Sequence, residues 1–167
     1  MTDQITLVSS EGTKFQTSSK ISQLSGLIER ILQDYNINEE IPLRSVCSLN
    51  LQRIIDYSSH HNFSPPIRPK KPVVSNQLRD NFTDEWDAQF IESIPESELI
   101  DLISASNYLD MKSLLDTCLV KIACSFKDKS VEEIEKEYDI QEHFTPEVEE
   151  KLKQEYSWAM EVEPEEN

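Results

Sequence analysis

The stretch "SASNYLDMKSLLD", residues 104–116, begins as an apolar helix and places Asn107 and Tyr108 side by side in its last turn, just before the chain bends. An amide and a phenol are unexpected in a segment that is otherwise suited to burial. Two readings of the pair are open from these residues alone. Asn107 helps to turn the chain at the end of the helix, or the pair is kept as a contact for another protein.

The sequence around this break predicts two helices between Pro95 and Phe126. Apolar residues recur at the 3.6-residue spacing of an amphipathic helix in both halves. The residues expected to line the first helix are Leu99, Leu102, Ile103 and Ser106. Those expected to line the second are Leu114, Leu115, Cys118, Leu119, Ile122, Ala123 and Phe126.

The N-terminal part mixes strand and helix patterns. Residues 5–17 alternate around "SSEG" and predict a β-hairpin with Gly12 in its turn. A helix is expected over residues 18–35, then a short edge strand over 40–46 that contains Pro42, then a helix from a Ser48 cap to His60. Strands followed only by helices indicate an α+β domain with a helical extension.

Residues 62–84 interrupt these patterns. The stretch "NFSPPIRPKKPVV" holds four of the eight prolines, which favours a mobile loop or linker. Its "RPKKP" could serve as a nuclear signal or a proline-motif ligand, but both patterns are common by chance and a plain loop is favoured. A short helix is expected to begin near Asp84.

Two short acidic helices close the chain. Ser130 and Glu133 form a capping box for the first, and Thr145 followed by Pro146 opens the second. Each has only one narrow apolar line, yet large side chains are kept at Tyr138, Ile140, Phe144, Tyr156 and Trp158. Periodicity leaves two readings open: these helices fold back on the α+β domain, or they close over a helix of a partner, with the aromatic side chains as its pocket.

Charge and composition exclude several classes of function. The formal net charge is −16, and residues 130–167 carry −11 of it, from 14 acidic and 3 basic residues. Such a field repels nucleic acid and anionic lipid, so neither is expected as a partner. With no apolar run of roughly 20 residues, no secretory signal and three scattered cysteines, we expect an intracellular protein without disulfides.

No catalytic, cofactor-binding or metal-ligating set is expected. The two glycines cannot build a phosphate-binding loop, and no Ser/His/Asp arrangement stands out. His60 and His61 suggest a metal at first sight. Neighbours on a helix point about 100° apart, so the pair is not expected to share one ion, and no third ligand lies near in sequence. Imidazoles at the negative end of a helix dipole are the favoured reading.

Several of these stretches together resemble one known family. They are "LVSSEGTKFQTS", "IPLRSV", "IIDYSSHH", "WDAQFI", "NYLDMKSLLD" and "EEIEKEYDIQEHFTPEVEEKLKQEYSW", in this order over nearly the whole chain. The chain resembles the S-phase kinase-associated adaptor family of SCF (Skp, cullin, F-box) ubiquitin ligases. The Asn-Tyr-Leu-Asp junction and the "FTPE…E…W" ending are the most specific parts of the match.

The resemblance implies a BTB/POZ domain over residues 1–126, an F-box-binding helical extension over 127–160 and an acidic tail over 161–167. It implies that Asn107 and Tyr108 face a cullin. It also implies an F-box protein on a surface made of Leu115, Leu119, Ile122, Phe126, Tyr138, Ile140, Phe144 and Trp158.

The sequence departs from the family pattern at several of these places. Leu119 stands where relatives usually carry cysteine, Tyr138 replaces a phenylalanine, and Glu135 replaces an arginine. The 62–84 loop is proline-rich and partly basic where many relatives are strongly acidic. These changes imply an F-box pocket of altered shape.

The expected function is that of a non-catalytic adaptor in a heteromeric ubiquitin ligase complex of the cytoplasm and nucleus. The main alternative is a BTB-type structural scaffold that homodimerises in another assembly, such as a kinetochore complex. A third hypothesis, an acidic chaperone for basic proteins, rests on the charged last quarter. An enzyme is the least favoured class.

Overall fold

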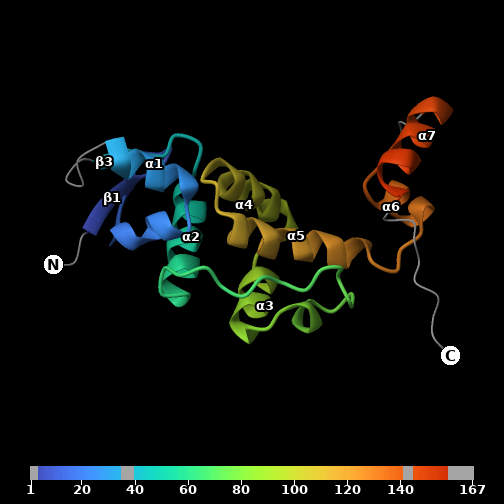
Figure 1. The fold of residues 1–167 in the computed structure, drawn as a ribbon, viewed down its shortest axis with the longest axis horizontal. Coiled ribbons are helices and arrows are strands. Elements are labelled where there is room, and N and C mark those ends of the chain that lie inside the picture. The colour runs from blue at the N-terminus through green and yellow to red at the C-terminus, as the bar shows by residue number, and fades with distance from the viewer. Residues whose placement is uncertain (1–3, 35–39, 141–144, 158–167) are drawn as a thin grey trace. The chain divides into compact units, whose positions relative to one another are not determined.

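The computed structural model describes residues 4–34, 40–140 and 145–157. The chain forms two compact units, Met1–Asp128 and Lys129–Asn167. The first unit contains a small sheet and most of the helices, and the second contains α6 (Val131–Glu137) and α7 (Pro146–Glu155) (Figure 1). The α+β class predicted from the sequence is confirmed.

A three-stranded sheet of order β2-β1-β3 opens the first unit. β1 (Gln4–Val8) pairs antiparallel with β2 (Lys14–Ser18) and parallel with β3 (Glu40–Pro42), so that Leu7 lies between Phe15 and Ile41. The two-residue period of the strand buries Ile5 and Leu7. The predicted hairpin is confirmed, and Gly12 supplies the positive φ of 81° that its turn needs.

The predicted strand over residues 40–46 is too long, because β3 ends at Pro42. The Leu43 N–H still donates to the Val8 carbonyl oxygen of β1 at 2.7 Å, and Pro42, which has no N–H to donate, lies in an edge strand as predicted. A turn follows, in which the Val46 N–H donates to the Leu43 carbonyl oxygen at 3.1 Å.

The single helix predicted over residues 18–35 is two elements in the structure, a 3₁₀ helix, η1 (Ser19–Gln23), and α1 (Gly26–Asp34). The break lies at Ser25, whose hydroxyl donates to the Leu109 carbonyl oxygen at 2.6 Å and accepts from the Ile28 N–H at 3.2 Å. A side chain that bonds the backbone in this way caps a new helix. The 3.6-residue spacing of apolar residues does not predict that one helix ends and another begins at this point.

Helix α2 (Ser48–His60) is confirmed, but its N-cap residue is Cys47 and not Ser48. The Ser48 N–H donates to the Glu11 carboxylate at 3.0 Å, and its hydroxyl lies 2.9 Å from that of Ser9. The hairpin therefore provides hydrogen-bond partners for the first residue of α2. The hydrogen bonds that Ser48 donates to Glu11 lower the pKa of that carboxylate.

Three helices complete the first unit: α3 (Glu85–Glu92), α4 (Glu96–Tyr108) and α5 (Lys112–Phe126). Asp84 caps α3 by accepting the Trp86 N–H at 2.9 Å, as the predicted start near Asp84 requires. The core joins the buried faces of α2, α4 and α5 with the sheet, and Tyr57 of α2 is fully buried in it. Burial raises the pKa of Tyr57 to about 12.

Residues 62–84 run alongside α5 and form a short 3₁₀ helix, η2 (Leu78–Asn81) (Figure 1). Asn81 is fully buried and organises the segment. Its side-chain oxygen accepts the Val74 N–H at 2.8 Å, and its amide donates to the carbonyl oxygens of Ser75 and Gln77 at 2.8 and 2.9 Å. A buried side chain with every polar atom bonded holds this proline-rich segment in one conformation.

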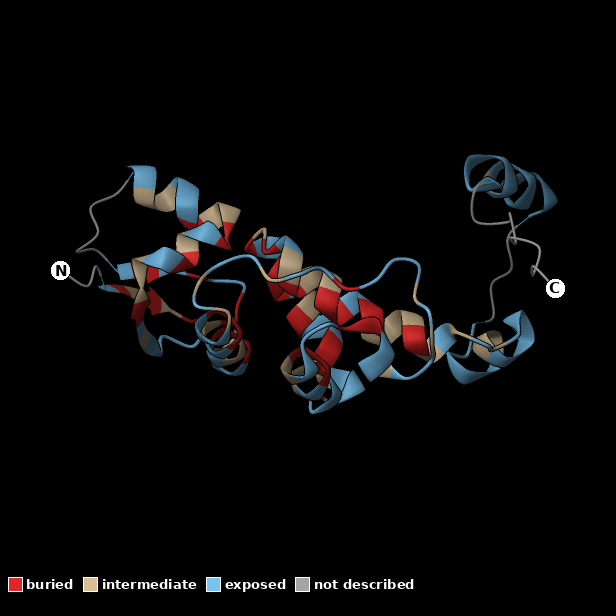
Figure 2. Cartoon of the chain, turned by 60° about the horizontal axis from the view of Figure 1, so that its bottom comes forward, coloured by how far each residue is buried: buried red, intermediate tan, exposed pale blue. Residues whose placement is uncertain are grey.

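The second unit differs from the first in burial. The capping box of Ser130 and Glu133 is present on α6, and Pro146 opens α7 with Thr145 at its N-cap position. Neither helix contains a buried residue within the described part of the chain, and both are exposed over most of their length (Figure 2).

We predict that Asn81→Ala lowers the free energy of unfolding by about 1–3 kcal/mol, because it removes a fully buried side chain and its three hydrogen bonds to the backbone of the segment. Asn76→Ala, the same change at an exposed position of the same segment, is the control and should shift it by less than about 0.5 kcal/mol. Urea denaturation of the two variants measures the difference. Equal small effects would show that the segment is not held by Asn81.

Candidate protein-interaction surfaces

The turn between α4 and α5 ends α4 with a Schellman motif. The Met111 N–H donates to the Ser106 carbonyl oxygen at 2.9 Å, and the Asp110 N–H donates to that of Asn107 at 3.0 Å. Asp110 takes the left-handed conformation, with φ of 54°, that such a turn demands. The predicted break is confirmed, and Asp110, rather than Asn107, supplies the unusual backbone conformation.

This turn is bound to the start of α1. The Gly26 and Leu27 N–H groups donate to the carbonyl oxygens of Asp110 and Leu109 at 3.3 and 3.2 Å. A Cβ at position 26 would lie 2.3 Å from an Asp110 carboxylate oxygen, so a larger residue there would require the Asp110 side chain to move. Leu109 and Met111 are fully buried, which fixes the direction in which α4 ends.

Asn107 and Tyr108 lie on the outer side of this fixed turn. Both are exposed, Tyr108 at 40% of its surface, and neither side chain makes a hydrogen bond to another described residue. The pair is thus exposed and does not itself supply the turn, and its role as a contact for another protein stays a prediction. Ile100 lies two turns earlier on the same helix face and is 57% exposed. Sequence reasoning missed Ile100, although an apolar residue seven positions before Asn107 was the available signal.

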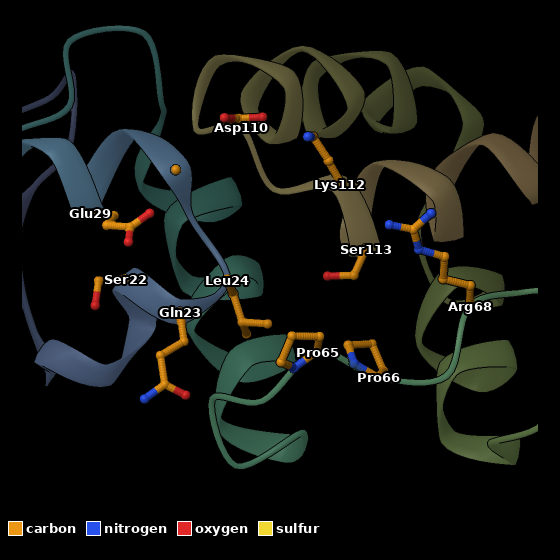
Figure 3. Close-up of a pocket in the computed structure, with 11 residues that line it drawn as sticks. Ser22, Gln23, Leu24, Glu29, Pro65, Pro66, Arg68, Asp110, Lys112 and Ser113 are labelled. Carbon is orange, nitrogen blue, oxygen red and sulfur yellow. The ribbon is translucent and has the colours of Figure 1, made fainter.

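A pocket of about 320 Å³ lies beside the same turn (Figure 3). It is lined by residues of η1, the start of α1, the Pro65–Arg68 stretch and the first turn of α5. Charges of both signs line it, from Glu29, Arg68, Asp110 and Lys112. The pocket is open and lined by charges of both signs, unlike the enclosed apolar sites that hold most small ligands.

Helix α5 is two-sided. Its inner side is buried through Leu114, Thr117 and Cys118, and burial raises the pKa of Cys118 to about 12. The Lys121 ammonium group, also on this helix, donates to the carbonyl oxygens of Ile91, in the last turn of α3, and of Ile94, which follows α3. These contacts hold α5 against the core.

The outer side of α5 carries the first four residues of the predicted F-box surface. Leu119 is 44% and Phe126 37% exposed, whereas Leu115 and Ile122 are half-buried. The predicted single apolar stripe was thus wrong in one respect, because its members divide between two faces. Large apolar side chains held at the surface of a well-anchored helix are suited to a protein interface.

Tyr138 and Ile140, which follow α6, are also exposed, at 44% and 45%. Val148 of α7 and Tyr156, its C-cap residue, are exposed as well. Phe144 and Trp158 lie outside the described residues. The assignment of all these residues to an F-box interface, and of Asn107 and Tyr108 to a cullin interface, stays a prediction.

His60 and His61 lie at the end of α2, as expected, but their predicted divergence is wrong. His61 is the C-cap residue, outside the regular helix, so the ligand atoms of His60, His61 and Asp84 all lie within 4.8 Å of one another. His60 bonds Asp84 at 3.1 Å, and His61 bonds the buried Asp87 at 2.8 Å. Each of these ring nitrogens thus has a carboxylate partner, and the group joins α2 to α3.

The pKa values of the two carboxylates, Asp84 and Asp87, are shifted in opposite directions. The hydrogen bond with His60, aided by the Trp86 N–H, lowers the pKa of Asp84, whereas burial raises the pKa of Asp87. The His60 ring also stacks on Trp86, with centroids 3.9 Å apart. This arrangement accounts for the paired histidines as a structural link.

Among the described helices, none is both long enough and apolar enough to cross a membrane.

Two protein-family models match this chain and identify its fold. Residues 3–63 match the tetramerisation domain of the Skp1 family, a POZ domain, and residues 112–159 match the dimerisation domain of the same family. The first match covers the sheet, α1 and α2, and the second covers α5 to α7. The fold is thus an α+β POZ domain with C-terminal helices.

Related proteins align with this chain over nearly its whole length. The E3 ubiquitin ligase complex SCF subunit sconC of Arthroderma benhamiae is 37% identical over 161 residues, which cover 96% of this chain and 97% of the relative. The S-phase kinase-associated protein 1 homolog of Tetrahymena thermophila is 33% identical over 159 residues, 95% of each chain. This chain belongs to the Skp1 family.

We predict that Leu119→Ser changes the free energy of unfolding by less than about 1 kcal/mol, because the side chain is already substantially in water. Leu114→Ala on the buried side of the same helix should cost about 2–5 kcal/mol. Denaturant titration of the two variants compares the two faces directly. A loss at Leu119 as large as that at Leu114 would mean that this leucine serves the fold rather than a partner.

Proposed function

We propose that this protein is the adaptor subunit of an SCF-type ubiquitin ligase, which holds an F-box protein and a cullin at the same time. Its family membership supports this role, since relatives over nearly the whole chain are named as SCF subunits. The observation that carries the proposal is the exposed apolar face of a firmly anchored helix, α5.

The F-box protein occupies the outer side of α5 together with the C-terminal unit. The helices of that unit bury nothing among the described residues and expose Tyr138 and Ile140. Short helices without a core of their own gain stability from a partner that covers their apolar side. An amphipathic partner helix laid on such side chains is a common mode of recognition.

The cullin occupies the outer face of α4, through Ile100, Asn107 and Tyr108. Exposed aromatic side chains on a rigid element are typical interface anchors, because they bury a large area with little loss of side-chain freedom. The Schellman turn and its bonds to α1 provide this rigidity.

The protein itself takes no catalytic part. Its contribution to ubiquitin transfer is proximity: it brings a substrate held by the F-box protein near the catalytic subunits assembled on the cullin. We place this activity in the cytoplasm and nucleus.

We predict that Leu119→Glu raises the Kd for an F-box domain by roughly 30-fold or more, because a charge replaces an exposed apolar contact of the proposed surface. The matched control is Leu49→Glu, which puts the same charge on an exposed leucine of α2 and should leave the Kd unchanged. Isothermal titration calorimetry with a purified F-box domain gives both values. Equal affinities of the two variants would refute the assignment of α5.

We predict the opposite pattern for the double substitution Asn107→Ala and Tyr108→Ala. Cullin binding should weaken by roughly tenfold or more through loss of the tyrosine anchor, while F-box binding is retained. Gln52→Ala with Asp56→Ala, two exposed positions of α2, is the control. Pull-down of the cullin N-terminal region, with thermal melts of each variant, tests the outcome; unchanged cullin binding would disprove this interface.

A further inference from the structure

The outer face of α5 has a neighbour that the helix pattern did not suggest. Residues of the 62–84 segment and of α5 enclose an open pocket of about 170 Å³. Lys70, Lys71 and Val73 line one side, and Asp116, Leu119 and Ala123 of α5 line the other. Leu119, a member of the F-box surface proposed above, therefore lies at the border of the α5 face and this segment.

The segment is held beside α5 by bonds along its length. The Lys70 N–H donates to the Asn81 carbonyl oxygen and its ammonium group to that of Asp80, both at 3.0 Å. Val73 packs against the core, and the buried Asn81 amide also approaches the Cys124 sulfur of α5 at 3.4 Å. These contacts make the segment one side of the pocket, and we call this side, Lys70–Val73, the wall.

The wall carries positive charge in an otherwise acidic chain. Three of the four residues Arg68–Lys71 are basic, while the whole protein has a net charge of −16. The Lys71 ammonium group lies 2.9 Å from the Asp116 carboxylate, which is only 16% exposed, whereas the lysine side chain is 64% exposed. An ammonium group has three donors, so Lys71 keeps hydrogen-bonding capacity toward a partner while Asp116 orients it.

We propose that Lys70–Val73 forms a second wall of the F-box surface, and that Lys70 and Lys71 favour F-box helices with an acidic side chain next to the apolar one that contacts Leu119. The inference rests on the proposed function and adds the charge of the partner to it. Apolar lining on α5 and two ammonium groups at its edge match an amphipathic helix with one acidic position. Because these charges are exposed, they contribute selectivity and salt dependence more than total affinity.

The test uses the full-length protein and one purified F-box domain in two forms: the native form, chosen for acidic residues in its first helix, and a form with those residues changed to lysine. The variant Lys70→Glu with Lys71→Glu should bind the native form roughly tenfold more weakly at low salt and the lysine form more tightly than the unaltered protein does. The affinity of the variant for the native form should also rise, not fall, with salt.

Two controls separate the causes. Lys14→Glu with Lys20→Glu makes the same change in net charge on exposed positions of β2 and η1, and should leave both affinities unchanged apart from a general charge effect. Lys70→Gln with Lys71→Gln, which adds no repulsion with Asp116, should show an intermediate loss. Thermal melts establish that each variant is folded.

The outcomes distinguish the inference from the function on which it rests. If the unaltered protein binds the F-box domain but reversal of the two lysines affects both forms equally or not at all, the wall is wrong and the adaptor role stands. If the unaltered protein binds neither form, both the adaptor role and the wall fall.

Discussion

The turn at Leu109–Met111 is the constraint on which the two proposed interaction surfaces depend. It combines a left-handed Asp110, two buried side chains and hydrogen bonds to the start of α1, and the Asp110 side chain lies directly against Gly26. Because the turn has one geometry, the end of α4 and the beginning of α5 have fixed directions. Asn107 and Tyr108 are exposed as a consequence of this geometry, and so is the outer side of α5.

Helix α5 satisfies two opposed demands with one sequence. Its inner face packs on the core through Leu114 and Cys118, and the ammonium group of Lys121 bonds carbonyl oxygens at the end of α3 and just after it. Its outer face keeps Leu119 and Phe126 in contact with water, which lowers the stability of the free protein relative to a helix with a polar outer side. A surface of this kind is expected where a partner completes the core, as in a permanently heteromeric subunit.

The negative net charge of the chain acts over longer distances than these contacts do. Residues 130–167 carry most of the negative charge, and the helices there expose their apolar side chains. Mutual repulsion of these carboxylates favours a partner that carries basic or neutral groups. The basic stretch Arg68–Lys71 is the local exception, and it lies beside the outer face of α5.

Local rules were sufficient for much of the architecture. The alternation of residues 5–17, the apolar periods of α2, α4 and α5, and the capping box of Ser130 each depend on neighbours in the sequence, and all are present in the structure. The errors at Ser25, Pro42 and Cys47 lie at element ends, where groups distant in sequence supply the bonds: Leu109 bonds Ser25, and Glu11 bonds the start of α2. The sequence did not predict that His60, His61 and Asp84 lie together, because Asp84 is likewise distant from the two histidines along the chain.

By itself, the sequence determined the α+β class, the order of the elements and, through its quoted motifs, the family. Only the tertiary structure decided which apolar residues of α5 are inside and which are outside, and that the proline-rich segment packs beside that helix around Asn81. The physical reason is that a period of 3.6 residues tells which side chains share a face, whereas burial depends on what other parts of the chain cover that face.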